Sequence, residues 1–151
     1  MEEKSSQISE RLLDYGVSII KIYNRISDSE VGKHIGKQLL RSGTSIGANY
    51  EEACGAESKA DFIHKIRIIL KETRETLYWL KLIQRSGLLK GDKGEVKGDK
   101  DGIKGEFEKN LKKQTEKSND EVDIVKIIEE TSQLSKIFGK SIITAREKND
   151  K

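Results

Sequence analysis

Apolar residues recur at alternating gaps of four and three near the start of the chain, at Ile8, Leu12, Tyr15, Ile19, Ile22 and Ile26. This spacing places all of them on one face of an α-helix. None of the 151 residues is proline, so no proline interrupts such a helix. A chain of this kind is expected to form long helices that each bury one face.

Three further segments carry apolar residues or threonines at helical spacing. The second has Val31, Ile35, Leu39, Ile46 and Tyr50. The third has Phe62, Ile66, Ile69, Thr73, Thr76, Leu80 and Ile83. The fourth has Ile124, Ile128, Thr131, Phe138 and Ile142.

Capping residues set the expected helix boundaries. Residues 27–30 are placed to cap the second helix, Ser58 the third and residues 118–121 the fourth, and Gly87 is placed to end the third. Helices are therefore predicted over about residues 5–26, 29–54, 58–86 and 120–147. Their similar lengths predict an all-α, antiparallel up-down four-helix bundle that spans residues 1–151 as a single domain.

The segment between the third and fourth helices is rich in glycine and charge. Residues 90–106 read KGDKGEVKGDKDGIKGE and offer almost nothing to bury. We therefore predict a long, flexible, charged loop over about residues 90–117. It either has no function of its own or acts as a lysine-rich tether to nucleic acid or a protein.

Composition narrows the class of protein. The formal net charge of +3 is too small for a general polyanion binder, and the lone cysteine excludes an internal disulfide. No apolar run approaches the roughly 18 residues of a membrane span, and the N-terminus lacks the order of a signal peptide. The sequence therefore predicts a soluble, cytoplasmic protein that does not enter a membrane.

Glycines mark one face of the second helix. Gly32, Gly36, Gly43 and Gly47 lie within about 60° of one another on a helical wheel. Each interior glycine costs roughly 1 kcal/mol relative to alanine. We therefore expect close helix packing inside the bundle at this face.

The third helix carries two further faces. One is a stripe that we interpret as an oligomer interface, because a lone bundle would expose its Ile68, Trp79 and Leu82; a wide core that buries them is the alternative. The stripe consists of Ile68, Glu72, Glu75, Trp79 and Leu82. The other is the basic face of Arg67, Lys71, Arg74, Lys81 and Arg85, with Tyr78 among them.

The basic face of the third helix and a shorter stripe on the second, Lys33, Lys37 and Arg41, are candidate nucleic-acid-binding residues. Rows of cations can follow phosphates, but they can equally pair with neighbouring acids. Both interpretations stay open at the level of sequence.

Residues for catalysis are sparse. The only histidines are His34 and His64, and no nucleotide-binding glycine motif is present. We therefore expect no cofactor, no metal site and no enzymatic activity. The alternative is a metal-dependent or acid–base enzyme that uses Glu52, Glu72, Glu75 and His64.

Two stretches, residues 42–58 and 61–83, resemble the four-helix bundle family associated with 23S ribosomal RNA intervening sequences. The first motif of that family matches Ser45, Ile46, Asn49 and Glu52. The second matches Asp61, Phe62, Lys65, Leu70, Lys71, Glu72, Glu75, Thr76, Tyr78, Trp79 and Leu80. Ala53 stands where that family usually has glycine.

The resemblance implies a ring-shaped homopentamer of up-down bundles with no established catalytic activity. It also implies RNA or a nucleoprotein as the partner, since one branch of the family accompanies the reverse transcriptase of diversity-generating retroelements. A purely protein-binding scaffold is the remaining alternative.

Overall fold

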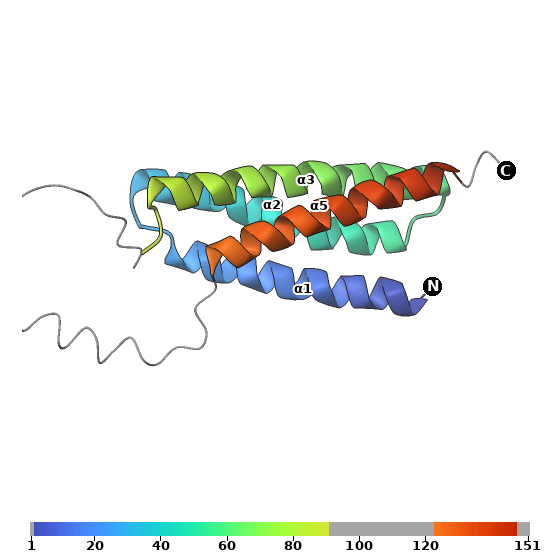
Figure 1. Ribbon diagram of the computed structural model, residues 1–151, viewed down its shortest axis with the longest axis horizontal. Helices are drawn as coiled ribbons and strands as arrows, with labels where there is room; N and C mark the ends of the chain where they lie inside the picture. The colour runs from blue at the N-terminus through green and yellow to red at the C-terminus, as the bar shows by residue number, and fades with distance from the viewer. Residues whose placement is uncertain (1, 91–122, 148–151) are drawn as a thin grey trace, which may run out of the picture.

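The computed structural model describes residues 2–90 and 123–147. These residues form four helices: α1 (Glu2–Arg25), α2 (Glu30–Cys54), α3 (Lys59–Ser86) and α5 (Ile124–Glu147). The helices run alternately in opposite directions along one long axis (Figure 1), which confirms the predicted all-α four-helix bundle. Within the described ranges, no helix is long and apolar enough to cross a bilayer.

The caps predicted for the second and third helices are confirmed. Ser29 Oγ accepts a hydrogen bond from the Gly32 amide, and Ser58 Oγ accepts one from the Asp61 amide, each at 3.1 Å. Gly87 ends α3 in the left-handed region with φ 63°, where glycine is favoured.

The start of α5 differs from the predicted fourth helix. The helix begins at Ile124, and the Asp123 carboxylate accepts a hydrogen bond from the Val125 amide at 2.8 Å. The predicted cap at residues 118–121 and most of the predicted loop lie outside the described residues.

The core follows the predicted faces closely. Ile19, Ile22, Leu39, Ile66 and Ile69 are among the most deeply buried side chains. Four residues of the predicted core faces are only partly buried: Ile8, Phe62, Ile128 and Ile142. Val31 is exposed in the first turn of α2, whereas α5 also buries Ile127 and Leu134.

The glycine face of α2 packs directly against α1, as predicted. A Cβ built on Gly43 would lie 2.8 Å from Ile19 Cγ2, and one on Gly36 would lie 3.1 Å from the Tyr23 ring. Gly47 is looser, with Leu12 at 3.7 Å. The glycines therefore set how closely these two helices approach.

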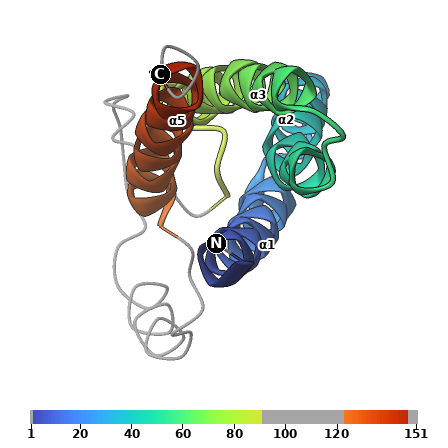
Figure 2. The same cartoon turned by 90° about the vertical axis from the view of Figure 1, so that its right-hand side faces the viewer.

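The helices are arranged in the order α1, α2, α3, α5, and the last of them makes few contacts with the first. The view along the bundle shows α1 and α5 spread apart (Figure 2). Three polar contacts bridge them: Arg11 forms a bidentate ion pair with Glu130 at 2.6 and 2.9 Å and donates to Gln133 Oε1 at 3.1 Å, and Tyr15 Oη lies 2.7 Å from Thr131 Oγ1. The bundle is therefore open along one edge.

Backbone hydrogen bonds tie the end of α3 to the turn between α1 and α2. The Ser27 amide donates to the Leu88 carbonyl at 2.8 Å, and the Lys90 amide donates to the Arg25 carbonyl at 2.7 Å. Ile26 and Leu89, which form the isolated bridge between these segments, are both buried. We refer to residues 25–27 and 88–90 as the end clasp.

Candidate nucleic-acid interface

The basic face of α3 points away from the core. Its five cations, Arg67, Lys71, Arg74, Lys81 and Arg85, are all exposed, and the deeply buried residues of α3 lie on the opposite side of the helix. Tyr78 is 59% exposed among them, and its ring meets that of Trp79 edge-on with centroids 4.9 Å apart. None of the five forms an ion pair with another residue of the described ranges.

The residues of the shorter basic stripe on α2 have different environments. Lys33 and Lys37 are exposed. Arg41 is instead held by α3, since its Nη2 pairs with Glu75 and its Nη1 lies 3.5 Å from Glu72 Oε2. Of the two interpretations left open by the sequence, pairing with acids applies to Arg41.

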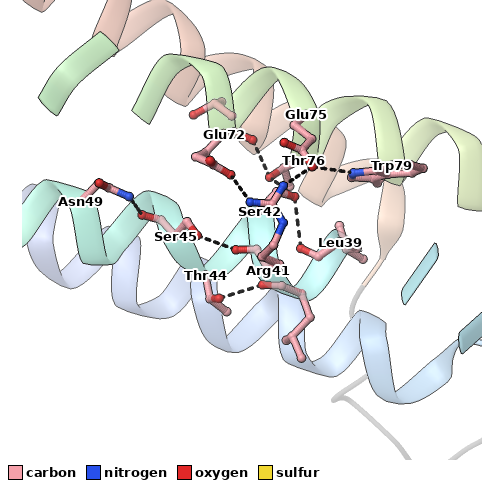
Figure 3. A network of polar contacts seen from close by, with 12 residues as sticks. Leu39, Arg41, Ser42, Thr44, Ser45, Asn49, Glu72, Glu75, Thr76 and Trp79 are labelled. Atoms are coloured by element: carbon pink, nitrogen blue, oxygen red, sulfur yellow. Dashed lines mark hydrogen bonds and ion pairs between the residues drawn. The ribbon is translucent and has the colours of Figure 1, made fainter. Parts of the chain in front are cut away.

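Arg41 sits in a polar cluster between α2 and α3 (Figure 3). Glu75 Oε1 also accepts a hydrogen bond from Trp79 Nε1 at 3.2 Å. The hydrogen bond from Arg41 lowers the pKa of Glu75 below its ordinary value, and the bond from Trp79 acts in the same direction. Glu72 Oε2 is buried, and Arg41 Nη1 at 3.5 Å is its partner in the ion pair.

The predicted oligomer interface on α3 is half-buried within the single chain. Trp79 and Leu82 pack against the core cluster, and Ile68 is also partly covered. Glu72 and Glu75 face Arg41. The expectation that one bundle leaves these apolar side chains fully in water is therefore not met, because each is partly covered within the single chain. The role of the stripe as an interface stays a prediction.

The family-motif residues make contacts within α2, at the start of α3 and between the two helices. Glu52 of the first motif forms an ion pair with Lys65 of the second. Asn49 Nδ2 donates to the Ser45 carbonyl at 2.8 Å within α2. Phe62 packs half-buried against the core. Asp61 presents its amide to the Ser58 cap, so these residues have a structural role at the seam.

The residues of the enzymatic alternative do not converge on one site. Glu52 pairs with Lys65, whereas Glu72 and Glu75 face Arg41. His64 is exposed. A lowered pKa keeps Glu75 ionised at neutral pH, which suits an ion pair and not a proton donor. In residues 2–90 and 123–147, no cluster of His, Cys, Asp or Glu side chains could hold a metal ion.

The structure adds an apolar groove on the outside of α1 and α2 that the sequence analysis did not find. Leu13, Val17 and Ile20 line it from α1, and Gly47 and Ala48 line it from α2. The spacing of the three α1 residues, at i, i+4 and i+7, indicates a second apolar stripe beside the core face.

Comparisons with known proteins agree with the fold. The model of the family described as 23S rRNA-intervening sequence protein matches residues 4–100. The chain is also similar to a solved structure from Bacteroides thetaiotaomicron, described as a protein with unknown function from the S23 ribosomal protein family. That match has 29% sequence identity and a TM-score of 0.64, and it covers 92% of this chain and 97% of the other. No curated protein matches the chain.

Proposed function

Because the chain belongs to the family of 23S rRNA-intervening sequence proteins, we propose that it is a self-assembling, non-enzymatic helical bundle that binds RNA through the basic face of α3. The observation that carries this proposal is the exposure of five cations on α3 without ion pairs in the described part of the chain. An RNA partner would be met in the cytoplasm, the location predicted from the sequence.

Exposed, unpaired cations suit phosphate better than paired ones do. A guanidinium such as Arg41 must first leave its carboxylates, whereas Arg67 and Arg74 have no such partner among residues 2–90 and 123–147. Guanidinium groups also match the oxygens of a phosphate with two parallel hydrogen bonds. The exposed ring of Tyr78 offers a surface on which an unpaired base can stack.

Self-assembly would strengthen this weak attraction. One chain has a net charge of only +3, so long-range steering by a single subunit is modest. Several copies around a ring, five by family resemblance, would present several basic faces to one RNA strand. Linked contacts of this kind raise the apparent affinity without any new type of contact.

Electrophoretic mobility shifts with a short single-stranded RNA test the proposal. The double variant Arg67→Glu/Arg74→Glu should bind at least tenfold more weakly than the wild type at low salt. The matched control Lys140→Glu/Arg146→Glu changes the net charge by the same amount on exposed residues of α5 and should bind normally. Wild-type binding should weaken steeply as salt rises, because phosphate contacts release counterions.

Three outcomes would overturn the proposal. They are absence of binding at low salt, equal loss in both double variants, and unchanged binding in the Arg67→Glu/Arg74→Glu variant. The first would leave a protein-binding bundle, and the second would indicate general charge attraction without a defined face.

A further inference from the structure

The groove between α1 and α2 exposes several apolar side chains side by side. Leu13, Val17 and Ile20 are 64%, 46% and 45% exposed, and they line one side of a hollow of about 310 Å³. The small residues Gly47 and Ala48 line the other side. Contiguous exposed apolar surface of this kind is typical of interaction sites.

Gly16 also lines the groove, and the packing of the chain itself does not explain why this position is glycine. It lies inside α1, where glycine is unfavourable, and a Cβ built on it would meet nothing within 4 Å. By contrast, Gly43 is required by its contact with Ile19. The missing side chain at residue 16 keeps the groove open toward the outside, where another molecule can approach.

A surface that could fill the groove lies across the bundle on α5. In the view along the axis, α5 lies on one side and α2 on the other (Figure 2). The exposed apolar side chain near the start of α5 is Val125, which is 46% exposed. A chain with a groove on one side and an apolar knob on the opposite side can associate head to tail with copies of itself.

Val125 and the Ile20 end of the groove lie at the same level along the bundle axis. Tyr15 is level with Thr131 through their hydrogen bond, and α1 and α5 run in opposite directions. Val125 lies six residues before Thr131, so it is level with the position six residues after Tyr15, to within about one helical turn. That position adjoins Ile20. In a ring whose axis is parallel to the helices all copies share one height, so Val125 would reach the Ile20 end of the groove.

The charged residues near the groove and on α5 are also complementary when α5 of one copy lies in the groove of another. The exposed Glu51 lines the other end of the groove, and the exposed Glu10 directly follows Ser9, which also lines that end. By the same register, Glu10 is level with the exposed Lys136 of α5 to within about one turn. Carboxylates on one copy would therefore face a cation on the next.

We propose that the α1–α2 groove of one copy receives α5 of a second copy of this chain, with Val125 packed against Val17 and Ile20. This inference rests on the self-assembly proposed above and specifies which surfaces meet. The contact is head to tail, so a series of such contacts closes into a ring when the rotation between neighbouring copies divides a full turn evenly. Neither surface contains a cation of the α3 basic face, which stays free for RNA.

The test blocks each surface separately, with masses measured by light scattering after size exclusion. Val17→Arg closes the groove, and Val125→Arg removes the knob. Each variant alone should be monomeric, since each keeps one surface without a partner for it. An equimolar mixture should give one-to-one dimers and nothing larger, because the intact groove of one variant accepts the intact knob of the other. Val31→Arg, at an exposed valine away from both surfaces, is the matched control and should assemble like the wild type.

Circular dichroism of each variant checks that helicity is retained, which is expected at exposed positions. Loss of assembly in Val17→Arg but not in Val125→Arg would indicate a two-fold contact between grooves and overturn the head-to-tail arrangement. Normal assembly of both variants would move the interface elsewhere, with the predicted α3 stripe as the next candidate. A monomeric wild type at micromolar concentration would remove the proposed self-assembly as well.

Discussion

Gly16 of α1 and Gly43 of α2 differ in the space around them. Gly43 is closed in by Ile19, so a side chain there has no room. Gly16 has open space around it, so a methyl group would fit within the chain without displacing an atom. At the residue scale, one glycine serves folding and the other leaves a surface accessible.

Alanine at these two positions should therefore change stability in opposite directions. Gly43→Ala should lower the free energy of unfolding by about 1 kcal/mol, because the cost of overpacking exceeds the gain in helix propensity. Gly16→Ala should raise it by up to ~1 kcal/mol. Urea denaturation in the Val17→Arg background, where no assembly is expected to contribute, measures both. A loss of stability in Gly16→Ala would show that residue 16 is constrained by its own chain.

Tyr15 is a buried phenol with a defined hydrogen-bonding role. Thr131 uses its only hydroxyl proton on the Ile127 carbonyl at 2.6 Å, so Tyr15 must be the donor in the 2.7 Å contact between the two side chains. Burial raises the pKa of Tyr15 well above its ordinary value. The folded protein therefore holds this proton at pH values where the unfolded chain releases it.

Tyr15→Phe should reveal this difference. At neutral pH the variant should lose about 1 kcal/mol of stability with the hydrogen bond. The wild type should lose stability as pH rises above about 10, since only its unfolded state ionises there. That alkaline decline should be shallower in Tyr15→Phe, as measured by urea denaturation at pH 7 and at about pH 11. Thr131→Val, which leaves the phenol without its acceptor, should cost more at neutral pH than Tyr15→Phe.

At the scale of the elements, α2 and α3 are joined by ion pairs on their outer side as well as by the core. The ion pairs along this side are those of Arg41 with Glu72 and Glu75, and of Glu52 with Lys65. Because the hydrogen bond from Arg41 lowers the pKa of Glu75, the contribution of this pair is present above the ordinary glutamate pKa. It is lost as pH falls through the lowered value.

Glu75→Gln should remove that part of the acid dependence. The wild type should lose stability progressively below about pH 4.3, the ordinary glutamate pKa, as the unfolded chain takes up a proton that the folded chain resists. The glutamine variant should be less stable at neutral pH and decline less on acidification. Glu57→Gln, at an exposed carboxylate of the turn between α2 and α3, should keep the wild-type slope. Thermal denaturation from pH 7 to pH 3 compares the three.

Helical spacing and capping residues predicted the helices well, because both depend on residues that are close in the sequence. Ser29, Ser58 and Gly87 cap the helices where expected, since capping depends on residues within one turn. The partner of Arg41 was not predictable in this way, because it depends on which face of α3 lies next to α2. The same limit applies to the groove, since Leu13 and Val17 become a surface only once α2 is in place beside them.

At the scale of the whole molecule, the open edge makes α1 the least supported helix. It is held mainly by α2, with Arg11 and Tyr15 as its polar contacts to α5. Regions with few buried contacts open first and with the lowest free energy.

Hydrogen exchange should therefore show earlier exchange of the amides of α1 than of those of α2 and α3 in the monomeric Val17→Arg variant. Adding Arg11→Ala should speed exchange in α1 further and leave α2 and α3 unchanged, because only the contacts of Arg11 with Glu130 and Gln133 on α5 are lost. Uniform acceleration in all helices would show that the bundle opens only as a unit. Mass spectrometry of proteolytic fragments resolves the helices.

The end clasp has a consequence for how such a chain tolerates change. Backbone hydrogen bonds through Ser27 and Lys90 fix the chain at the end of α3, so contacts within residues 25–90 set the position of the chain at Lys90. Residues added or deleted beyond Lys90 therefore do not alter the position of that point. Descendants of one gene can diverge in length there without repacking the core, and a reporter domain could be spliced into the same place.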